Sequence, residues 1–556
     1  MKLVECVPNF SEGRDREKID TITKEIETTA QVELLDVDPG ESTNRTVVTF
    51  IGSPEGVVEA AFKAIKKAAE VIDMSQHQGA HSRMGATDVC PFVPVSGVDM
   101  DFCVQLAHQL GKRVAKELNI PVYLYEEAAQ KPERKNLANV RKGEYEGLAK
   151  KLEDPEWAPD YGEAVFNPKS GATIIGAREF LIAYNINLNT REKKLAREIA
   201  LNIREKGRAK RDENRKIVRD ENGKIVRIPG KFKHIKAVGW YVEDYGIAQI
   251  SINFTNYKIS PPHLVFDEVI KEAEKLGLRV TGSELVGLIP KEAILEAGRY
   301  YLKKQGKSAG LPDELLIKTA VSSLGLNDVS PFDPQKKIIE YQFSEVENSL
   351  LDLSLSKFAD ELSMDSPAPG GGSTAAYCGA LSASLSSMVS HLTEGKKGYE
   401  SVQDDVKQLA VDAQELKKKF LNAVDQDTVS FNKVMSAFGL PKKTDEQKEK
   451  RQQAIGDATK EATEVPFNVI KSSLEALKLA KEIAVKGNKN SVSDAGVAGL
   501  CAQAAAEGAY YNVMINLPSI EDKIYVKKMN KEATSLKNEC VKLGDELRDL
   551  MEKELS

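Results

Sequence analysis

A chain of 556 residues is too long for one hydrophobic core, so we expect two to four domains. The content of hydrophobic residues, 41%, and of charged residues, 29%, is typical of a soluble globular protein. The net charge of −6 gives no reason to expect nucleic acid as a partner, and the absence of any uncharged apolar stretch of about eighteen residues predicts no membrane span.

The cysteines and the N-terminus indicate the compartment. The six cysteines are scattered and form no CxxC motif, which argues against a disulfide framework and against a zinc ribbon. The first residues, MKLVECVPNFSEG, lack the long apolar core of a signal peptide. A cytoplasmic protein is therefore expected.

The first third of the chain alternates between strand-like and helix-like runs. Runs rich in β-branched residues and bounded by Pro, Gly and Asn predict strands, whereas apolar residues at helical spacing predict helices. The predicted strands are residues 3–7, 32–37, 45–51, 88–95 and 121–125, and the predicted helices are 56–72 and 102–118. This pattern indicates an α/β fold in which helices cover one side of a mixed sheet.

A second α/β segment follows. It comprises a strand at 178–190, a helix at 191–206, a strand pair at 234–254 and a helix at 262–276. The basic stretch 207–233 carries two RDEN copies, and we expect a charged hairpin or flexible insertion with no chemistry. Two stacked mixed-sheet subdomains are therefore predicted within residues 1–341.

The composition changes near Tyr341. Strand patterns disappear, and alanine, serine and lysine dominate. The predicted helices are 355–364, 373–393, 400–437, 444–486 (interrupted at Pro466), 494–517 and 520–553. Their lengths suit an all-α antiparallel bundle. The domains expected are 1–177 and 178–341, a linker at 342–352, and 353–556.

The loop SQHQGAHSRMGATDVCPFVP, residues 75–94, concentrates reactive groups. Two of the six histidines, His77 and His81, lie here with Arg83 between two predicted regular elements, and Gly79 and Gly85 argue for a loop. Because imidazole titrates near neutral pH, a general acid/base is the natural interpretation. A metal site and surface histidines without a role are the alternatives.

A carboxylate is predicted on the buried face of the helix at 400–437. Steps of three and four residues place Asp427 on one face with the apolar residues Leu416, Phe420, Val424, Phe431 and Val434. Asp425 lies on another face and can stay in water. Burial would raise the pKa of Asp427, as a proton-transferring group requires near pH 7. A structural Asp bonded to a backbone group or to a neighbouring helix is the alternative.

Two further features could share a pocket with Asp427. Asn512 and Asn516 lie four residues apart on a stripe of small residues that faces a packed interior. The turn Gly370–Gly372 opens a helix whose free amides could hold an anionic ligand. A glycine-rich helix start without a ligand explains the same turn.

The chain resembles the formimidoyltransferase-cyclodeaminase family, which acts on folate in histidine degradation. The transferase-like motifs are LVECVPNFSEG (3–13), LLDVDPGESTNRTVVTFIG (34–52), IDMSQHQGAHSRMGATDVCPFVPV (72–95), IPVYLYEEAA (120–129) and SELVGLIP (283–290). The cyclodeaminase-like motifs are APGGGSTAA (368–376), VDQDTVSF (424–431), SVSDAG (491–496) and AYYNVMINL (509–517). The agreement runs in order through both halves.

The resemblance implies roles for particular residues. The catalytic histidine of the family corresponds to His81, which leaves His77 a supporting residue at most. The cyclodeaminase acid/base corresponds to Asp427. The folate-binding segment falls on Gly162, Glu163, Ala164, Val165, Phe166, Asn167, Pro168, Lys169, Ser170 and Gly171.

The activity that the resemblance implies has two steps. The formimidoyl group moves from N-formimidoyl-L-glutamate to N5 of tetrahydrofolate, and ring closure then gives 5,10-methenyltetrahydrofolate and ammonia. Asp38 is a candidate to orient the His81 imidazole, and Arg45 and Arg83 are candidates to bind substrate carboxylates. The candidate groups around Asp427 are Asp494, Asn512, Asn516 and the glycines Gly370, Gly371 and Gly372.

The partners expected are small molecules. Tetrahydrofolate, as a polyglutamylated co-substrate, and formimidoylglutamate are the substrates that the resemblance implies, with no metal and with a homo-oligomer built from dimers. Two alternatives stay open: formimidoylglycine as the donor, and a non-catalytic folate-binding scaffold. The combination of His81 with Asp427 argues against the scaffold.

Overall fold

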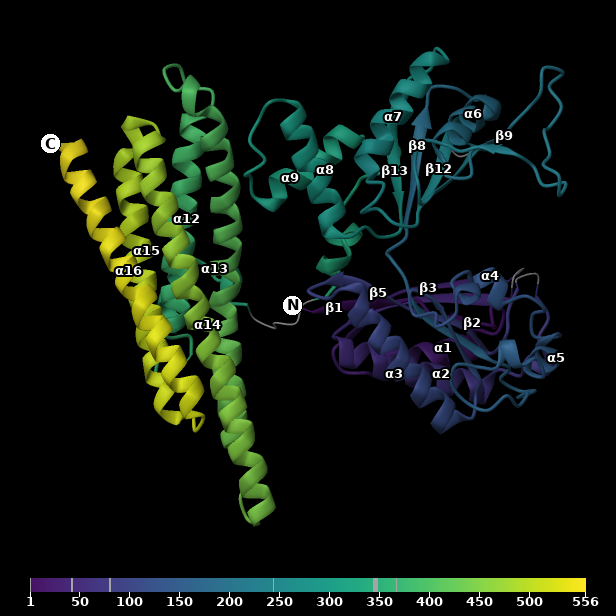
Figure 1. Ribbon diagram of the computed structural model, residues 1–556, viewed down its shortest axis with the longest axis horizontal. Coiled ribbons are helices and arrows are strands. Elements are labelled where there is room, and N and C mark those ends of the chain that lie inside the picture. The colour runs from purple at the N-terminus through teal and green to yellow at the C-terminus, as the bar shows by residue number, and fades with distance from the viewer. Residues whose placement is uncertain (1, 42–43, 80–81, 244, 344–348, 367) are drawn as a thin grey trace. The chain divides into compact units, whose positions relative to one another are not determined.

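The computed structural model describes residues 2–41, 44–79, 82–243, 245–343, 349–366 and 368–556 (Figure 1). The chain forms two compact units. One comprises Met1–Ala297 with Ala320–Glu345, and the other comprises Gly298–Thr319 with Val346–Ser556. The first unit contains mixed α/β structure and the second is helical, as the sequence predicts. No helix within the described ranges is long and apolar enough to cross a membrane.

The first unit begins with a mixed sheet of seven strands among the described residues. The strands are β1 (Leu3–Cys6), β2 (Asn9–Phe10), β3 (Val32–Gly40), β4 (Arg45–Gly52), β5 (Thr87–Ser96), β6 (Val122–Glu126) and β7 (Thr173–Ala177). Strand β7 lies between β5 and β6 and is parallel to both, whereas the other pairings are antiparallel. The carboxyl ends of β5, β6 and β7 therefore lie at one edge of the sheet.

Three helices cover one face of this sheet (Figure 1). They are α1 (Arg16–Glu27), α2 (Pro54–Val71) and α3 (Met100–Leu118), and the short helices α4 (Leu137–Val140) and α5 (Leu148–Leu152) follow β6. Each long helix begins where the sequence supplies an N-cap, because Asp15, Ser53 and Asp99 accept first-turn N–H groups. The buried faces of these helices join Val4, Phe50 and other strand residues in one apolar core.

A second, antiparallel sheet completes the first unit. Its order is β11 (Ile235–Val242), β12 (Ile247–Phe254), β8 (Ile182–Leu188) and β13 (Val280–Val286), with helices α6 (Lys193–Ile203) and α7 (Pro262–Lys275). Helices α8 (Lys291–Lys304), α9 (Asp313–Leu324) and α10 (Pro334–Lys337) follow β13 and were not anticipated from the sequence. The end of α8 and the start of α9 belong to the second unit.

The basic stretch 207–233 forms an arm with two short hairpins, in agreement with the charged hairpin expected there. Strands β9 (Arg208–Ala209) and β10 (Arg227–Ile228) pair at its base, and isolated bridges join Arg211 to Ile217 and Arg219 to Ile225. Each hairpin has the same bond, in which an arginine side chain donates to the carbonyl of the turn residue four positions later.

The second unit is a bundle of long helices. They are α11 (Leu355–Leu362), α12 (Gly371–Thr393), α13 (Gln403–Phe438), α14 (Asp445–Lys486), α15 (Val492–Asn516) and α16 (Lys523–Leu555). One apolar core runs through α12 to α16 and contains many alanines. Small side chains let these helix axes approach closely: a β-carbon on Gly508, for example, would stand 3.1 Å from Cβ of Ala375.

The expected interruption at Pro466 was wrong. Helix α14 continues through this buried proline. Proline has no N–H, so the carbonyl of Ala462, four residues earlier, loses its helical donor. The side-chain amide of Asn516 supplies a replacement, because Nδ2 donates to that carbonyl at 3.2 Å. A neighbouring helix therefore satisfies the group that proline leaves free.

Candidate active sites

The loop predicted to carry the catalytic histidine connects α2 to β5. A short 3-10 turn, Met74–Gln76, follows the helix, and Asp73 caps it by accepting the Ser75 N–H. His81 itself lies outside the described residues, so its role stays a prediction. Ser82, the next residue in the chain, is described and lines a cleft of the first unit.

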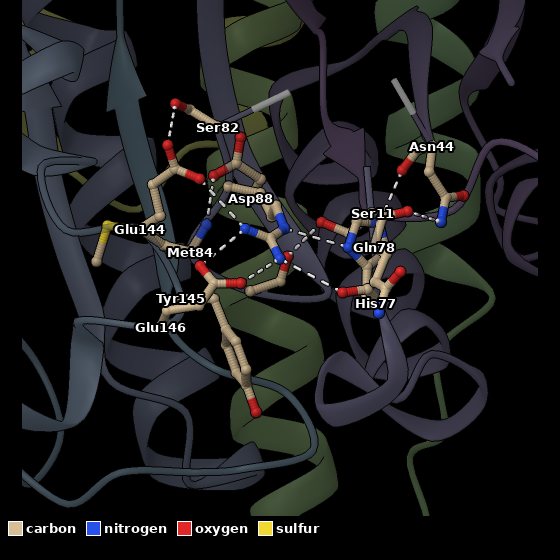
Figure 2. A network of polar contacts seen from close by, with 12 residues as sticks. Ser11, Asn44, His77, Gln78, Ser82, Met84, Asp88, Glu144, Tyr145 and Glu146 are labelled. Atoms are coloured by element: carbon tan, nitrogen blue, oxygen red, sulfur yellow. Dashed lines mark hydrogen bonds and ion pairs between the residues drawn. The ribbon is translucent and has the colours of Figure 1, made fainter. Parts of the chain in front are cut away.

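His77 belongs to a fixed hydrogen-bond network (Figure 2). Arg83 Nε donates to its Nδ1 at 3.2 Å, so the imidazole proton lies on Nε2, which donates to the carbonyl of Asn44 at 2.9 Å. Asn44 in turn donates to the carbonyl of Gln78 and accepts the N–H of Gly13. With both ring nitrogens engaged, His77 holds the loop, in line with a supporting role.

Arg83 is bound by carboxylates of the protein itself. Its side chain is 8% exposed and donates to Glu144 at 3.2 Å and to Glu146 at 2.6 Å. Glu144 also accepts the hydroxyl of Ser82 at 2.8 Å. The guanidinium thus joins the loop to the 144–146 turn. The sequence suggested that Arg83 binds substrate carboxylates. The structure pairs it with Glu144 and Glu146 instead, so these contacts support a positioning role.

A second ion pair, with the positions of the acid and the base exchanged, joins the same two segments. Asp88, fully buried at the start of β5, accepts from Arg141 and from the backbone N–H of Met84. Burial raises the pKa of Asp88, and the field of Arg141 opposes this rise. One pair has its cation on the loop and the other has its cation on the 141–146 segment, so neither segment can shift alone.

Asp38 and Arg45 lie on paired strands beside this loop. Asp38 is exposed on β3, opposite Val47 of β4. Arg45 begins β4, donates to Asn9 and lines the cleft. Burial lowers the pKa of Arg45, Arg141 adds to that effect, and Asp88 and Asp38 oppose it. Arg45 is therefore a cationic group at the cleft wall, close enough to Asp38 to feel its charge.

The segment Gly162–Gly171 ends in a turn against the same loop. The N–H of Gly171 donates to the Asn167 carbonyl at 2.7 Å, and the Ser170 N–H donates to Asn167 Oδ1. Lys169 accepts the Met74 N–H through its carbonyl and donates its ammonium to the carbonyl of Glu70. Gly171 has a φ of 65° and bridges Gly85. The residues 163–165 are exposed. The structure thus brings the predicted folate segment against the loop that carries His81.

A cleft of about 980 Å³ opens on the sheet face opposite the helices. Strand alternation separates the two faces: Val89 and Pro91 line the cleft, whereas Cys90 and Phe92 pack in the core with the helices. The second subdomain supplies the opposite wall, through Arg178, Glu179, Leu181, His234, Lys236, Thr255 and Asn256. This volume lies at the upper end of the range of small-molecule sites, about 300–1,000 Å³.

Sequence reasoning did not single out most of the charged residues of the cleft, among them Glu126, Arg141 and Glu144. A signal existed for the first of them, because Glu126 directly follows the predicted strand 121–125, and carboxyl ends of parallel strands are where ligands bind. The other two lie in the irregular 132–147 segment, which carries no periodic pattern.

In the second unit, Asp427 lies at the N-terminus of α12. The helix begins in the turn Gly370–Gly372, and Gly370 provides no side-chain cap. Asp427, from α13, accepts the backbone N–H of Ser373 and, at 3.3 Å, its hydroxyl. The carboxylate lies directly over Gly372, where a β-carbon would stand 2.5 Å from Oδ2. The two motifs predicted to share a pocket are therefore in contact.

Opposing effects act on the titration of Asp427. Burial raises its pKa, and the hydrogen bonds from Ser373 lower it without cancelling the rise. The direction agrees with the prediction from the helical wheel. The carboxylate is therefore both a substitute cap for α12 and a buried acid with a raised pKa.

The other residues predicted for this pocket divide into three cases. Asn512 is adjacent, since a β-carbon on Gly371 would stand 3.5 Å from its Nδ2. Asn516 bonds to the carbonyl that Pro466 leaves free, which explains it structurally. Asp494 begins α15, eighteen residues before Asn512, and a rise of ~1.5 Å per residue puts ~27 Å between them.

The expectation that Asp425 stays in water was wrong. Its carboxylate is half-buried and accepts the hydroxyl of Ser349 at 2.5 Å and the N–H of Leu350 at 2.9 Å. It fixes the segment that leads into the bundle. The helical wheel gave the correct face but could not show that another segment covers it.

No group of three or more His, Cys, Asp or Glu side chains that could hold a metal ion is found within the described ranges.

Comparison with known proteins agrees with this two-part organisation. Three family models match in order: "Formiminotransferase domain, N-terminal subdomain" at residues 3–178, "Formiminotransferase domain" at 183–344, and "Formiminotransferase-cyclodeaminase" at 354–535. The formimidoyltransferase-cyclodeaminase of Mus musculus is 44% identical over 542 residues, which cover 97% of each chain.

Single-function relatives match parts of the chain. The glutamate formimidoyltransferase of Thermoplasma acidophilum is 43% identical over 56% of this chain and 95% of its own. The methenyltetrahydrofolate cyclohydrolase of Methylorubrum extorquens is 37% identical over 36% of this chain and 98% of its own.

An α/β unit followed by a helical bundle, matched in that order, is the organisation of a multifunctional enzyme with a transferase part and a cyclodeaminase part. The chain belongs to the formimidoyltransferase-cyclodeaminase family. The resemblance read from the sequence is confirmed.

Proposed function

We propose that this protein is a bifunctional folate enzyme of histidine degradation. It transfers the formimidoyl group from N-formimidoyl-L-glutamate to N5 of tetrahydrofolate and then cyclises 5-formimidoyltetrahydrofolate to 5,10-methenyltetrahydrofolate with release of ammonia. The observation that carries the proposal is the match of both halves, in order and over 97% of the chain, to a formimidoyltransferase-cyclodeaminase.

The transfer step needs a base and an acid. N5 attacks the amidine carbon, a base takes the N5 proton, and an acid protonates the departing nitrogen of glutamate. One imidazole can do both in sequence, and we assign this to His81. The loop that carries it is held by Arg83, Asp88 and His77, and the Gly162–Gly171 turn packs beside it. Arg45, at the cleft wall, binds a substrate carboxylate, and Asp38 orients the imidazole.

The cyclisation step needs one proton shuttle. N10 attacks the formimidoyl carbon, its proton passes to the nitrogen that leaves, and breaking that carbon–nitrogen bond releases ammonia. Asp427 takes and returns the proton. Its raised pKa, its position over Gly372 and its proximity to Asn512 through the Gly370–Gly372 turn support this role.

Neither step calls for redox chemistry, and we propose that neither uses a metal. The co-substrate is polyglutamylated tetrahydrofolate, and the enzyme acts in the cytoplasm. The functional division of the chain is 1–177 and 178–341 for the transferase, 342–352 as a linker and 353–556 for the cyclodeaminase.

The enzyme is a homo-oligomer built from dimers. Support comes from the outer face of the α12–α15 pair, where large apolar side chains are exposed. Its members are Leu381, Met388 and Leu392 on α12 and Val497, Leu500, Tyr511 and Ile515 on α15. An apolar stripe along two adjacent helices is typical of a face that another subunit covers.

The test mixes tetrahydrofolate with N-formimidoyl-L-glutamate and follows methenyl-folate absorbance and ammonia. We expect His81→Ala to stop transfer and to leave cyclisation of supplied 5-formimidoyltetrahydrofolate intact, and Asp427→Ala to do the reverse. Loss of both steps through one substitution, in a protein that stays folded, would show that the two-site assignment is wrong.

Two neighbouring activities are separated by the same assay. The relative in Methylorubrum extorquens is named as a methenyltetrahydrofolate cyclohydrolase, which makes hydrolysis of the methenyl product a second candidate for the helical half. Ammonia formation from 5-formimidoyltetrahydrofolate identifies a cyclodeaminase, whereas loss of methenyl absorbance without ammonia identifies the hydrolase. Replacing the donor by formimidoylglycine tests the alternative donor.

A further inference from the structure

Two charged residues follow the ends of adjacent parallel strands at the cleft. Glu126 is the last residue of β6 and pairs with Ala177, the last residue of β7, so Arg178 comes directly after its neighbour. The N–H of Glu127 donates to the Ala177 carbonyl at 3.0 Å, which fixes the two strand ends together. Both Glu126 and Arg178 line the cleft.

Glu126 has an unusual backbone. Its φ is 52°, in the left-handed region that residues other than glycine adopt only with strain. The half-buried carboxylate faces the cleft, and among the described residues no cation lies within 4.0 Å of it. Burial raises its pKa, and Glu127 adds to the rise, while Arg178, Lys236 and Lys135 oppose it. Strain and an open carboxylate together indicate a group kept for a ligand.

Lys236 lies on the opposite wall, on β11 of the second sheet. Its side chain alternates with buried Ile235 and Ala237 and is exposed to the cleft. Neither Lys236 nor Arg178 has a carboxylate partner within 4.0 Å among the described residues, where the guanidinium of Arg178 donates to the carbonyl of Glu179. Among the other charged residues of the cleft, Arg141 pairs with Asp88, Glu144 with Arg83, and Glu179 with Lys258.

The charges of Glu126, Arg178 and Lys236 complement those of the donor. N-formimidoyl-L-glutamate carries two carboxylates and one amidine, and an amidine is a cation at neutral pH. We propose that Arg178 and Lys236 bind the two donor carboxylates and that Glu126 binds the formamidinium group, so that Lys236 makes the site select a dicarboxylate donor. This inference rests on the proposed transferase function and assigns the donor subsite to the end of β6 and the facing edge of β11.

The test compares two donors that differ by one charge. N-formimidoyl-L-glutamine has the shape of the glutamate donor but carries a neutral amide in place of the side-chain carboxylate. For Lys236→Gln in the full-length protein we expect KM for the glutamate donor to rise about 10- to 100-fold, the effect of losing one charge-assisted hydrogen bond, with kcat nearly unchanged. KM for the glutamine donor should stay within ~3-fold of the wild-type value, so the preference between donors disappears.

Two further variants complete the design. Lys233→Gln removes the same charge from an exposed lysine three residues away that does not line the cleft, and it should keep the wild-type preference. Glu126→Gln should lower kcat/KM for both donors alike, because both carry the formimidoyl group. Cyclisation of supplied 5-formimidoyltetrahydrofolate should be equal in all variants.

Calorimetric titration of N-formimidoyl-L-glutamate separates the two hypotheses. If the wild-type protein transfers the group and Lys236→Gln keeps both the donor preference and the binding constant, the subsite is refuted and the proposed function stands. If the wild-type protein binds the donor through Lys236 but transfers nothing, the subsite stands and the function is refuted. Absence of donor binding by the wild-type protein refutes the subsite as well.

Discussion

Gly372→Ala is the sharpest test of the second site, because it displaces the Asp427 carboxylate without changing any polar group. The new β-carbon would stand 2.5 Å from Oδ2 of Asp427, and closer to Oδ1 and Cγ. Ordinary contact needs ~3.5 Å, so the carboxylate must move by at least ~1 Å. That movement breaks its bonds to the backbone N–H and the hydroxyl of Ser373.

Displacement of a reacting group by ~1 Å lowers a rate about 100-fold. We therefore expect Gly372→Ala to lower kcat for cyclisation by roughly two orders of magnitude and to leave formimidoyl transfer unchanged. The matched control is Gly371→Ala in the same turn, where the nearest atom to the new β-carbon is Asn512 Nδ2 at 3.5 Å. Helix propensity favours alanine by about 0.5–1 kcal/mol at both positions, so this contribution to stability does not separate them.

The assay supplies 5-formimidoyltetrahydrofolate and follows methenyl-folate absorbance for the two variants and the wild-type protein. Equal cyclisation by Gly372→Ala and Gly371→Ala would refute the reasoning, because it would mean that the position of Asp427 over Gly372 has no bearing on the reaction.

Three further predictions concern the framework of the sites. Arg83→Lys replaces a planar guanidinium bound to two glutamates by one ammonium group. We expect this variant to lower the rate of formimidoyl transfer at least about tenfold and to leave cyclisation unchanged. Equal loss of both activities would contradict this. Glu5 is fully buried, and burial raises its pKa to about 7, so the folded state keeps a proton that the unfolded state releases near pH 4.5. Stability of the first unit therefore falls between about pH 4.5 and 7 by roughly 3 kcal/mol, and Glu5→Gln removes this fall. Denaturant unfolding followed by fluorescence measures it, since both tryptophans lie in that unit, and parallel curves for wild type and variant would refute it. Asn516→Leu leaves the Ala462 carbonyl without its donor and should lower the free energy of unfolding by about 1–2 kcal/mol. The loss should be much smaller in a Pro466→Ala background, where the helix supplies an N–H to that carbonyl. A double-mutant cycle followed by circular dichroism tests this coupling.

Local periodicity predicted the features that one segment decides. The face of α13 that carries Asp427 follows from steps of three and four residues, and the structure places the carboxylate in the wall of the bundle with Phe420 and Val424. The β-branched runs likewise gave most of the strands. In these cases the side-chain direction depends only on the backbone of its own element.

Features that depend on a distant partner were not predictable in the same way. Nothing near Arg83 in the sequence indicates the glutamates about sixty residues later that neutralise it. Asn516 reads as a pocket residue because the orphaned carbonyl that it satisfies lies fifty-four residues earlier. Asp494 shows the opposite error: a motif on the same helix as Asn512 is still distant from it, because a helix separates its own ends.

The duplicated arm has a consequence for how this chain can change length. Equivalent positions, eight residues apart, are occupied by Lys210, Val218 and Val226. The backbone N–H of Val218 donates to the Lys210 carbonyl, and that of Val226 donates to the Val218 carbonyl. Adding or excising one eight-residue copy would rejoin the chain in the same phase, with the pairing of β9 and β10 intact below it. The arm contributes no residue to the cleft, so a tag or reporter sequence could be spliced into it.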